Sequence, residues 1–316
     1  MEYRTLGRTG LEASVLGIGG GGLSRLGQST GYDSAHSVAI VRQAIEHGVN
    51  LIDTSEVYGT EPIVGEAIGG FERDRIIIST KKTPRDDNGV IGATRLIEGL
   101  EASLERLRTD RIDIYHLHGV RADDYERVRD ELVPTLERLR SDGKIAAIGI
   151  TEAFNSDPAH RMLESAVADD CWEVMMVGFN ILNQSARSRV LATAREKGIG
   201  ILDMFAVRND LHQPEKLKET VAKLIERGEV DGRKIDRDDP LGFLLRPDDP
   251  HAAVSLPDAA YRFCRDEPGI DVVLCGTSSP EHLRDNVASI ERPPLPDSDR
   301  SKLIELFGSV DSVSGQ

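Results

Sequence analysis

The sequence alternates between short apolar runs and longer segments with helical periodicity, and this alternation restricts the possible fold more than any other feature. Within residues 94–107, Leu96, Leu100, Leu104 and Leu107 form the stripe of an amphipathic helix. The eight apolar runs are candidate strands, at residues 14–20, 49–54, 75–80, 112–118, 144–151, 172–179, 198–205 and 271–277. Strands that alternate with helices are usually parallel and joined by right-handed crossovers. Eight such units predict a closed (β/α)8 TIM barrel rather than an open doubly wound sheet.

Two regions depart from this alternation. Residues 3–14 contain a glycine turn and predict an N-terminal β-hairpin ahead of the first strand. A long insertion follows strand 7, from Ala206 to about Asp271, and insertions of this kind in compact folds are usually binding loops or lids. Because the 316-residue chain shows no linker, we expect one barrel domain over residues 1–316.

The glycine-rich run GIGGGG at residues 17–22 lacks the context of a dinucleotide-binding fingerprint. That fingerprint needs a helix directly after G-x-G-x-x-G and an acidic residue about 20 positions further on. We therefore interpret the run, with Gly20 and Gly21 at its centre, as a turn where the backbone approaches a ligand closely.

Composition limits the compartment and the partners. A net charge of −15 argues against nucleic acid as the main partner, because phosphate binding needs a basic surface. No apolar run approaches the ~18 residues that span a membrane, and the N-terminus lacks the pattern of a signal peptide. Three cysteines without metal-ligand spacing indicate reduced thiols. We expect a cytoplasmic protein.

Polar residues follow three consecutive predicted strands, where a barrel places its catalytic groups. Asp53 ends strand 2 and Tyr58 lies in the following loop. Lys81, with Lys82 beside it, ends strand 3, and His118 ends strand 4. An acid, a phenol, an ammonium and an imidazole at neighbouring strand ends predict a catalytic site.

These four residue types suit a proton donor for carbonyl reduction. A tyrosine with a pKa of about 10 is a weak acid at neutral pH, and a buried cation beside it would stabilise the phenolate. We expect Lys81 to lower the pKa of Tyr58, Asp53 to hold Lys81, and His118 to orient the carbonyl oxygen. A cofactor would supply the hydride.

The sequence resembles the aldo-keto reductase superfamily. The resemblance rests on YRTLGRTGLEAS, NLIDTSEVYG, ISTK, DIYHLH, AIGITEA and CGTSSPEHLRDNV, which occur in the family's order over nearly the whole chain. It implies a (β/α)8 barrel that binds NADP(H) at its C-terminal face without a Rossmann domain. It also implies that Asp53, Tyr58, Lys81 and His118 are the catalytic residues, and it favours Lys81 over Lys82 because Lys81 directly follows the ST pair.

The resemblance also places the nicotinamide end of the cofactor. Thr151 and Glu152 occupy the positions that commonly hold the carboxamide, and Met176 stands where many members have a glutamine. We therefore expect Glu152 to carry more of the carboxamide binding. After strand 7, Phe205 replaces a frequent serine, and Ala206 and Arg208 follow it in the cofactor-binding segment.

The last motif bears on the choice of cofactor. By resemblance, Gly276, Thr277 and Ser278 lie near the adenosine ribose phosphate and Asn286 near adenine. His282 stands where many members have a basic or amide anchor, so Arg208 and Arg284 are the remaining candidates to bind a 2′-phosphate. We expect NADP(H), with NAD(H) as the alternative. The substrate would be a small carbonyl or alcohol, selected by the insertion and the C-terminal tail.

Two other function classes fit parts of the sequence. His116 and His118 share one face of a strand and, with Asp53, could ligate a metal as in barrel hydrolases, although Tyr58 and Lys81 would then have no role. Some relatives, the potassium-channel β subunits, act mainly as nucleotide-binding partners of other proteins. All four catalytic residue types are present here, which favours an enzyme.

Overall fold

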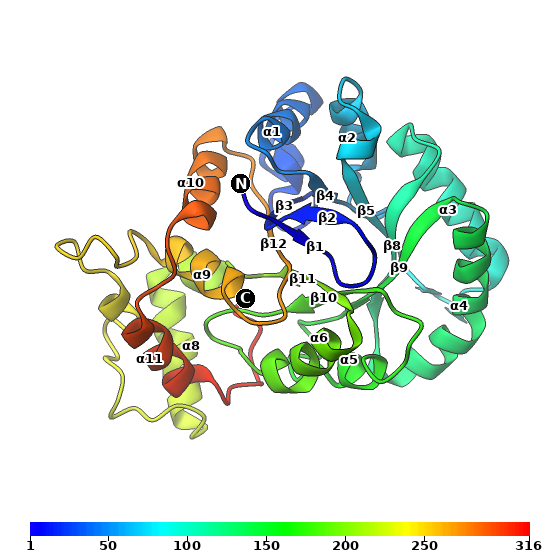
Figure 1. Ribbon diagram of the computed structural model, residues 1–316. Coiled ribbons are helices and arrows are strands. Elements are labelled where there is room, and N and C mark those ends of the chain that lie inside the picture. The colour runs from blue at the N-terminus through cyan, green and yellow to red at the C-terminus, as the bar shows by residue number, and fades with distance from the viewer.

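The computed structural model describes residues 1–316 and contains a closed, all-parallel eight-stranded barrel. The TIM barrel expected from the sequence is confirmed, and each of the eight predicted runs overlaps a barrel strand, although β5, β8 and β9 end one or two residues later than predicted (Figure 1). The strands follow one another around the barrel in chain order. They are β3 (Leu16–Gly19), β4 (Leu51–Asp53), β5 (Ile77–Lys82), β8 (Ile112–Val120), β9 (Ile145–Glu152), β10 (Val174–Gly178), β11 (Gly200–Met204) and β12 (Val272–Cys275).

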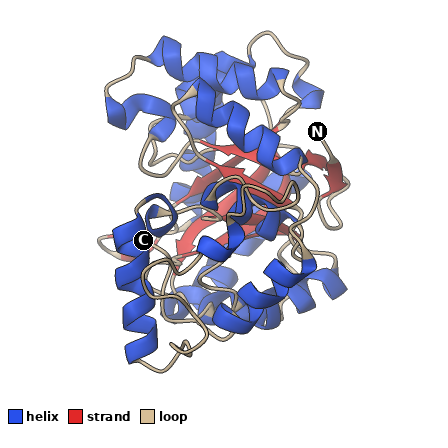
Figure 2. Ribbon diagram, turned by 90° about the vertical axis from the view of Figure 1, so that its left-hand side faces the viewer, coloured by secondary structure: helices blue, strands red, loops and turns tan.

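Helices surround the barrel and cover its outer face (Figure 2). They are α1 (Ser34–Glu46), α2 (Glu61–Ile68), α3 (Ala93–Leu107), α4 (Tyr125–Ser141), α5 (Arg161–Ala166), α6 (Ala192–Lys197), α7 (Asn209–His212), α8 (Pro214–Glu226), α9 (Leu256–Arg265), α10 (Pro280–Glu291) and α11 (Asp297–Phe307). The leucine stripe predicted for residues 94–107 is buried against the barrel in α3. No helix is long and apolar enough to cross a membrane.

The insertion after β11 holds more helix than its sequence indicated. The segment contains α7, which is a single turn, α8 and α9. Helix α9 packs against α10 and β12 and lies between β11 and β12 in the chain, so it is the outer helix of the seventh βα unit. Its start is fixed by Ser255, whose hydroxyl accepts a hydrogen bond from the Asp258 N–H, and by Pro257 in the first turn.

The predicted N-terminal hairpin, β1 (Tyr3–Thr5) and β2 (Glu12–Ser14), closes the end of the barrel where the strands begin. Leu6 is fully buried and belongs to the interior cluster of the barrel, next to Leu51 and Leu202. The turn presses against β11, where a Cβ on Gly7 would lie 2.2 Å from the Gly200 nitrogen. The opposite end, where the strands finish, is therefore the end left for a site.

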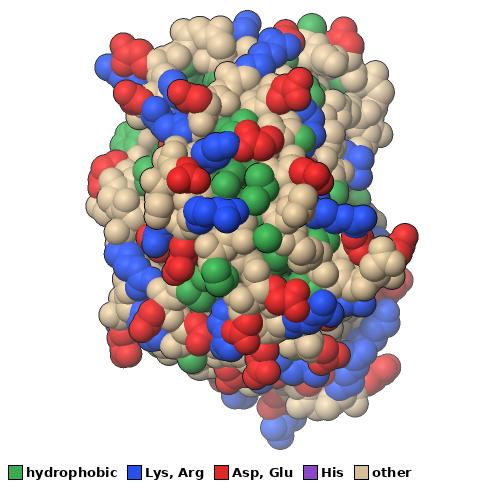
Figure 3. All heavy atoms as spheres, turned by 90° about the vertical axis from the view of Figure 1, so that its right-hand side faces the viewer, with side chains coloured by type: hydrophobic (Ala, Val, Ile, Leu, Met, Phe, Trp, Pro, Cys, Tyr) green, Lys and Arg blue, Asp and Glu red, His purple; other side chains and the backbone are tan.

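Charged side chains of both signs are interspersed over the outer face that α3 and α4 cover (Figure 3). Many of them form ion pairs at the surface, such as Lys144 with Glu101 and Arg127 with Glu131. Such exposed pairs contribute about 0–1 kcal/mol each, so the apolar interior carries the stability of the fold.

We predict that Leu6→Ala lowers the free energy of unfolding by about 2–5 kcal/mol, because it opens a cavity at the sealed end of the barrel. Urea denaturation followed by circular dichroism measures this change. Val254→Ala is the matched control, since Val254 is 64% exposed and its truncation leaves no cavity. Equal effects of the two substitutions would show that the hairpin is not part of the cooperative core.

Candidate active site

A buried ion pair lies at the end of the barrel where the strands finish. The Lys81 ammonium donates to both carboxylate oxygens of Asp53, at 2.7 and 2.6 Å, and to the Thr54 carbonyl oxygen at 2.7 Å. Lys81 is fully buried and Asp53 nearly so. Both side chains face the barrel interior, because β4 and β5 pair in register and their residues alternate inward and outward. All three ammonium hydrogens therefore have acceptors.

Lys82 points to the opposite side of β5. Its ammonium pairs with Glu56 at 2.9 Å, and its aliphatic chain packs against Gly99 of α3. Of the two neighbouring lysines, only Lys81 therefore lies in the barrel interior.

The structure brings Tyr58 and His118 together above the ion pair. The Tyr58 hydroxyl and the His118 Nε2 are 3.2 Å apart, and the Lys81 ammonium lies 5.1 Å from the centre of the Tyr58 ring. On its other side, the His118 Nδ1 is 3.1 Å from the Ser55 hydroxyl. The four predicted catalytic side chains thus form one connected group, to which Ser55 adds a contact that the sequence pattern did not single out.

Burial sets the protonation of both groups at the mouth. Burial first, and then the Lys81 charge, lower the pKa of His118 to about 3, so this imidazole is neutral at physiological pH. Burial also raises the pKa of Tyr58 and outweighs the opposing effect of Lys81. This corrects our expectation for Tyr58: the cation limits the rise in pKa but does not bring the pKa below its ordinary value.

His116 extends the network below the mouth. Its Nε2 is 3.1 Å from the Ser79 hydroxyl, which itself donates to an Asp53 oxygen at 2.7 Å. Since a hydroxyl has one hydrogen and an ionised carboxylate has none, Nε2 must be the donor to Ser79. The His116 Nδ1 is then an acceptor, and it is buried without a partner.

Asp53, His116 and His118, the ligands of the metal-site alternative, are not arranged as a metal centre. Asp53 is paired with Lys81, while His116 bonds to Ser79 and His118 to Tyr58 and Ser55. No group of three or more histidine, cysteine or acidic side chains is placed to hold a metal ion. This arrangement gives no support to the hydrolase alternative.

The glycine run lies beside the catalytic group. The Gly20 N–H donates to the Asp53 carbonyl oxygen at 2.6 Å. A Cβ on Gly20 would lie 2.6 Å from the Thr60 hydroxyl, and one on Gly21 would lie 2.6 Å from the Tyr58 ring. Glycine is therefore needed at position 21 for Tyr58 to keep its place, and at position 20 for Thr60 to keep its place.

The residues expected to bind a carboxamide are divided between two environments. Thr151 faces the barrel interior, where its hydroxyl accepts a hydrogen bond from the Gly119 N–H at 2.7 Å, and Met176 packs among the interior residues. The Glu152 carboxylate instead accepts hydrogen bonds from His160, at 2.9 Å, and from the Gly178 N–H, at 2.8 Å. It is fully buried, so its placement does not support the expected carboxamide contact.

An aromatic stack follows β11. Phe205 adopts a left-handed backbone conformation, with φ of 75°, and its ring stacks on Phe154 at 6.2 Å between centroids. Ala206 is buried directly after it. The Arg208 guanidinium lies 3.9 Å from the centre of the Phe205 ring, donates to Asn155 at 2.7 Å and also contacts Gln316. Burial lowers the pKa of Arg208 to about 10, which leaves it charged at neutral pH.

The loop after β12 is held in a fixed shape before α10 begins. The Thr277 hydroxyl accepts a hydrogen bond from the Ser279 N–H at 3.0 Å, and the Ser279 side chain caps α10 by accepting from the His282 N–H. His36 of α1 donates from its Nε2 to the Ser278 carbonyl oxygen at 2.7 Å, an anchor that the sequence pattern did not reveal.

The remaining residues of this loop differ in exposure. Gly276 is exposed and faces the glycine run after β3, since a Cβ on it would lie 3.7 Å from the Gly19 carbonyl oxygen. His282 and Arg284 are both exposed on α10, whereas Asn286 is half-buried. The two glycine loops and the start of α10 form a backbone cradle beside the catalytic group.

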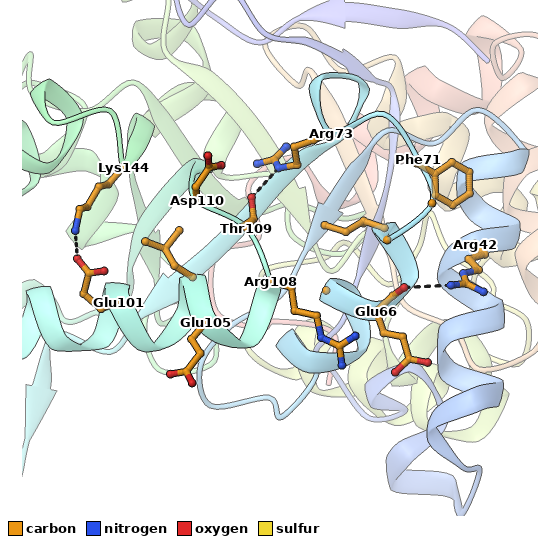
Figure 4. Close-up of a pocket in the computed structure, with 15 residues that line it drawn as sticks. Arg42, Glu66, Phe71, Arg73, Glu101, Glu105, Arg108, Thr109, Asp110 and Lys144 are labelled. Atoms are coloured by element: carbon orange, nitrogen blue, oxygen red, sulfur yellow. Dashed lines mark hydrogen bonds and ion pairs between the residues drawn. The ribbon is translucent and has the colours of Figure 1, made fainter.

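Two hollows differ in their relation to this group. The larger, of about 1070 Å³, lies between the ends of α2 and α3 at the opposite end of the barrel and contains none of the predicted site residues (Figure 4). In it, Lys144 pairs with Glu101, and Arg73 donates to the Thr109 hydroxyl. A smaller cavity of about 350 Å³ includes His118 in its wall. Of these two cavities, the smaller therefore adjoins the catalytic group, at His118.

Comparisons with known proteins agree with this geometry. L-galactose dehydrogenase of Arabidopsis thaliana is 25% identical over 328 residues, covering 99% of this chain and 95% of that protein. The NADH-specific methylglyoxal reductase of Escherichia coli is 26% identical, covering 98% of this chain and 100% of that protein. Among solved structures, the holo form of aldo-keto reductase AKR11C1 from Bacillus halodurans matches with a TM-score of 0.76 and 25% identity, covering 99% of this chain and 98% of that one.

The model of the aldo/keto reductase family matches residues 15–306, from the first barrel strand into the last helix. The resemblance read from the sequence is thereby confirmed. This chain belongs to the aldo/keto reductase family and is an oxidoreductase of that family.

Proposed function

We propose that this enzyme interconverts a carbonyl compound and its alcohol with NAD(P)H, and that Tyr58 is the proton donor. The observation that carries the proposal is the contact between the Tyr58 hydroxyl and the His118 Nε2 above the buried Lys81–Asp53 pair. A carbonyl oxygen at this point meets two neutral donors, the phenol and the imidazole N–H. NAD(P)H supplies the hydride when it is bound.

The chain's own residues account for the proton transfer. As negative charge develops on the carbonyl oxygen, Tyr58 passes its proton to that oxygen and becomes a phenolate. The Lys81 ammonium, 5.1 Å from the ring centre, stabilises the phenolate charge in a site of low dielectric. Asp53 holds the ammonium in place, and Ser79 orients the carboxylate. His118 stays neutral throughout, so it orients the substrate oxygen without competing as an acid.

The cradle beside the catalytic group fits a dinucleotide. The glycine loops after β3 and β12 allow a ligand to approach the backbone, and the positive end of the α10 helix dipole would attract phosphate. Arg208 is the partly buried cation at this face, and it would exchange its contacts with Asn155 and Gln316 for a phosphate oxygen.

We further propose NADP(H) as the cofactor, with NAD(H) as the alternative. The family default supports NADP(H). Against it, His282 and Arg284 are exposed on α10 and neither is fixed by a side-chain contact, so a 2′-phosphate would have no preformed cationic partner there. A relative of this chain is named NADH-specific, which keeps the alternative open.

Tyr58→Phe should lower kcat for aldehyde reduction by about 10²–10⁴-fold, because it removes the acid while leaving the ring in place. Turnover is followed by nicotinamide absorbance with NADPH and with NADH over a panel of aldehydes, ketones and sugars. Cofactor dissociation constants, from fluorescence titration, should stay near those of the wild type. Tyr115→Phe is the matched control, since the Tyr115 hydroxyl is buried without a partner.

A Tyr58→Phe variant that keeps more than about a tenth of the wild-type kcat would contradict the assignment of the acid. A wild-type protein that binds the cofactor tightly but turns over no carbonyl compound would instead favour the nucleotide-binding regulatory class.

Lys81→Met should reduce kcat by more than about 10²-fold and destabilise the fold by about 3–5 kcal/mol, because it leaves Asp53 buried without its partner. Lys82→Met, the control at the neighbouring position, should have a mild effect on both. The double variant Asp53→Asn/Lys81→Met separates the two effects: it should regain stability, since no buried charge remains, and stay inactive. Recovery of activity in the double variant would show that the lysine acts only through stability.

The depressed pKa of His118 predicts a pH profile without an inflection near 6.5, the ordinary pKa of histidine. Because His118 takes up a proton only near a pKa of about 3, kcat/KM should not fall between about pH 8 and pH 5 on its account. The pH dependence of kcat/KM for one aldehyde measures this. A tenfold loss per pH unit below about 6.5 would show that the imidazole is more accessible to water than its burial indicates.

A further inference from the structure

A buried imidazole adjoins the catalytic ion pair but has no part in the proposed proton transfer. His116 of β8 is fully buried and lies in register with Lys81 of β5 and with Gly149 of β9. Its Nε2 is 3.1 Å from the Ser79 hydroxyl, and that hydroxyl is 2.7 Å from a carboxylate oxygen of Asp53. His116 is therefore two hydrogen bonds away from the carboxylate that holds Lys81.

The direction of these two hydrogen bonds is fixed. Burial first, and then the charge of Lys81, lower the pKa of His116 well below its ordinary value, so the imidazole is neutral and carries one N–H. Because the Ser79 hydroxyl gives its single hydrogen to Asp53, the imidazole hydrogen must be on Nε2. The imidazole thus donates to the hydroxyl, and this bond keeps the hydroxyl hydrogen directed at the carboxylate.

Two unfavourable features accompany this imidazole. Its Nδ1 is a buried acceptor without a partner, which costs free energy because the atom has lost its hydrogen bond to water. The neighbouring strand has a glycine at position 149, where a Cβ would lie 2.2 Å from Nδ1, and glycine weakens the interior of a strand. Packing alone would favour an apolar side chain at position 116, so the imidazole needs another explanation.

We propose that His116 is a positioning residue that acts through Ser79 on the catalytic ion pair. The inference rests on the proposed carbonyl chemistry, in which the charge of Lys81 stabilises the Tyr58 phenolate. Burial raises the pKa of Asp53, and the Lys81 charge and the hydrogen bond from Ser79 oppose that rise. If the carboxylate took up the lysine proton, the pair would become a carboxylic acid and a neutral amine, and the amine could not stabilise a phenolate.

This role affects the chemical step and not the binding of ligands. His116 is fully buried and is not part of the wall of the cavity at His118, so its substitution should lower kcat and leave KM unchanged. Loss of the neutral bond from His116 should lower kcat about three- to tenfold. Loss of the bond from Ser79, which has a charged acceptor, should lower it about ten- to a hundredfold.

The test is a double-mutant cycle on His116 and Ser79. It measures kcat and the single-turnover rate for 4-nitrobenzaldehyde, or for a faster compound of the panel, with NADPH and with NADH. His116→Leu removes the donor and should lower both rates about three- to tenfold, whereas His116→Gln keeps an N–H donor and should stay within about twofold of the wild type. In the Ser79→Ala background, His116→Leu should cause no further loss. KM and the cofactor dissociation constants should not change.

A stability measurement separates positioning from a structural role. Because His116→Leu also removes the unpaired Nδ1 acceptor, its urea-denaturation midpoint should not fall below that of the wild type although its kcat falls. Tyr115→Phe is the matched control in the same strand, since it removes a buried hydroxyl that has no partner and lies outside the network. It should leave kcat within about twofold of the wild type.

Three results would overturn the inference while leaving carbonyl reduction intact: wild-type kcat in His116→Leu, an equal loss in His116→Gln, or the same further loss in the Ser79→Ala background. If His116→Leu does not fold, His116→Met, which is apolar but more flexible, takes its place. Failure of both to fold would show that the imidazole is needed for stability, and would also overturn the inference. A wild-type protein that reduces no compound of the panel, with either cofactor, would overturn the proposed function and the inference with it.

Discussion

The buried pair of Lys81 and Asp53 is the interaction on which the rest of the site depends. Taking two charges out of water costs several kcal/mol per ion, and the cost is offset only where every remaining hydrogen-bonding position is filled. Here the Thr54 carbonyl takes the third ammonium hydrogen and the Ser79 hydroxyl adds a donor to the carboxylate. The barrel supplies these groups from the strands themselves, which gives the pair a geometry that a loop could not hold.

The low dielectric of this buried site also governs the protonation of Tyr58 and His118, the two groups above the pair. Burial raises the pKa of Tyr58 and lowers that of His118, so both stay neutral at physiological pH. The Lys81 charge disfavours the protonated form of both groups. It limits the rise in the pKa of Tyr58 and adds to the fall in the pKa of His118. The buried Lys81 charge thus makes proton release from Tyr58 easier and protonation of His118 harder.

Much of this arrangement follows from patterns of short range in the sequence. The eight strand runs were enough to predict the barrel, and strand alternation indicated that only one of the two neighbouring lysines points inward. That this one is Lys81 was implied by the family resemblance. The clustering of Asp53, Tyr58 and His118 followed in turn, because parallel strands that finish at one end of a barrel bring their last residues together.

Other features depend on the folded structure and cannot be predicted from a local sequence pattern. Glu152 turns to His160, and that contact needs a left-handed residue at His160, with φ of 57°, which nothing in the composition of the loop indicates. The pKa of Tyr58 is a balance between burial and a nearby cation, and only the depth of burial decides its sign. Helix α9 differs from these features, because its start carries local signals, the Ser255 cap and Pro257 in the first turn.

Apart from His118, the residues that hold the catalytic geometry are also separate from the residues that line the neighbouring cavity. The catalytic groups other than Tyr58 come from β4, β5 and β8, whose register is fixed by the barrel, while the walls of the neighbouring cavity come from the loops that follow β5 and β8. The Arg85–Asp124 pair joins those loops to each other and makes no contact with the catalytic group. A change in the loops can therefore alter which molecule reaches His118 without disturbing the Lys81–Asp53 pair, because the two sets of contacts share no residue. The hairpin that seals the far end of the barrel carries none of this chemistry, so substitutions there act on stability alone.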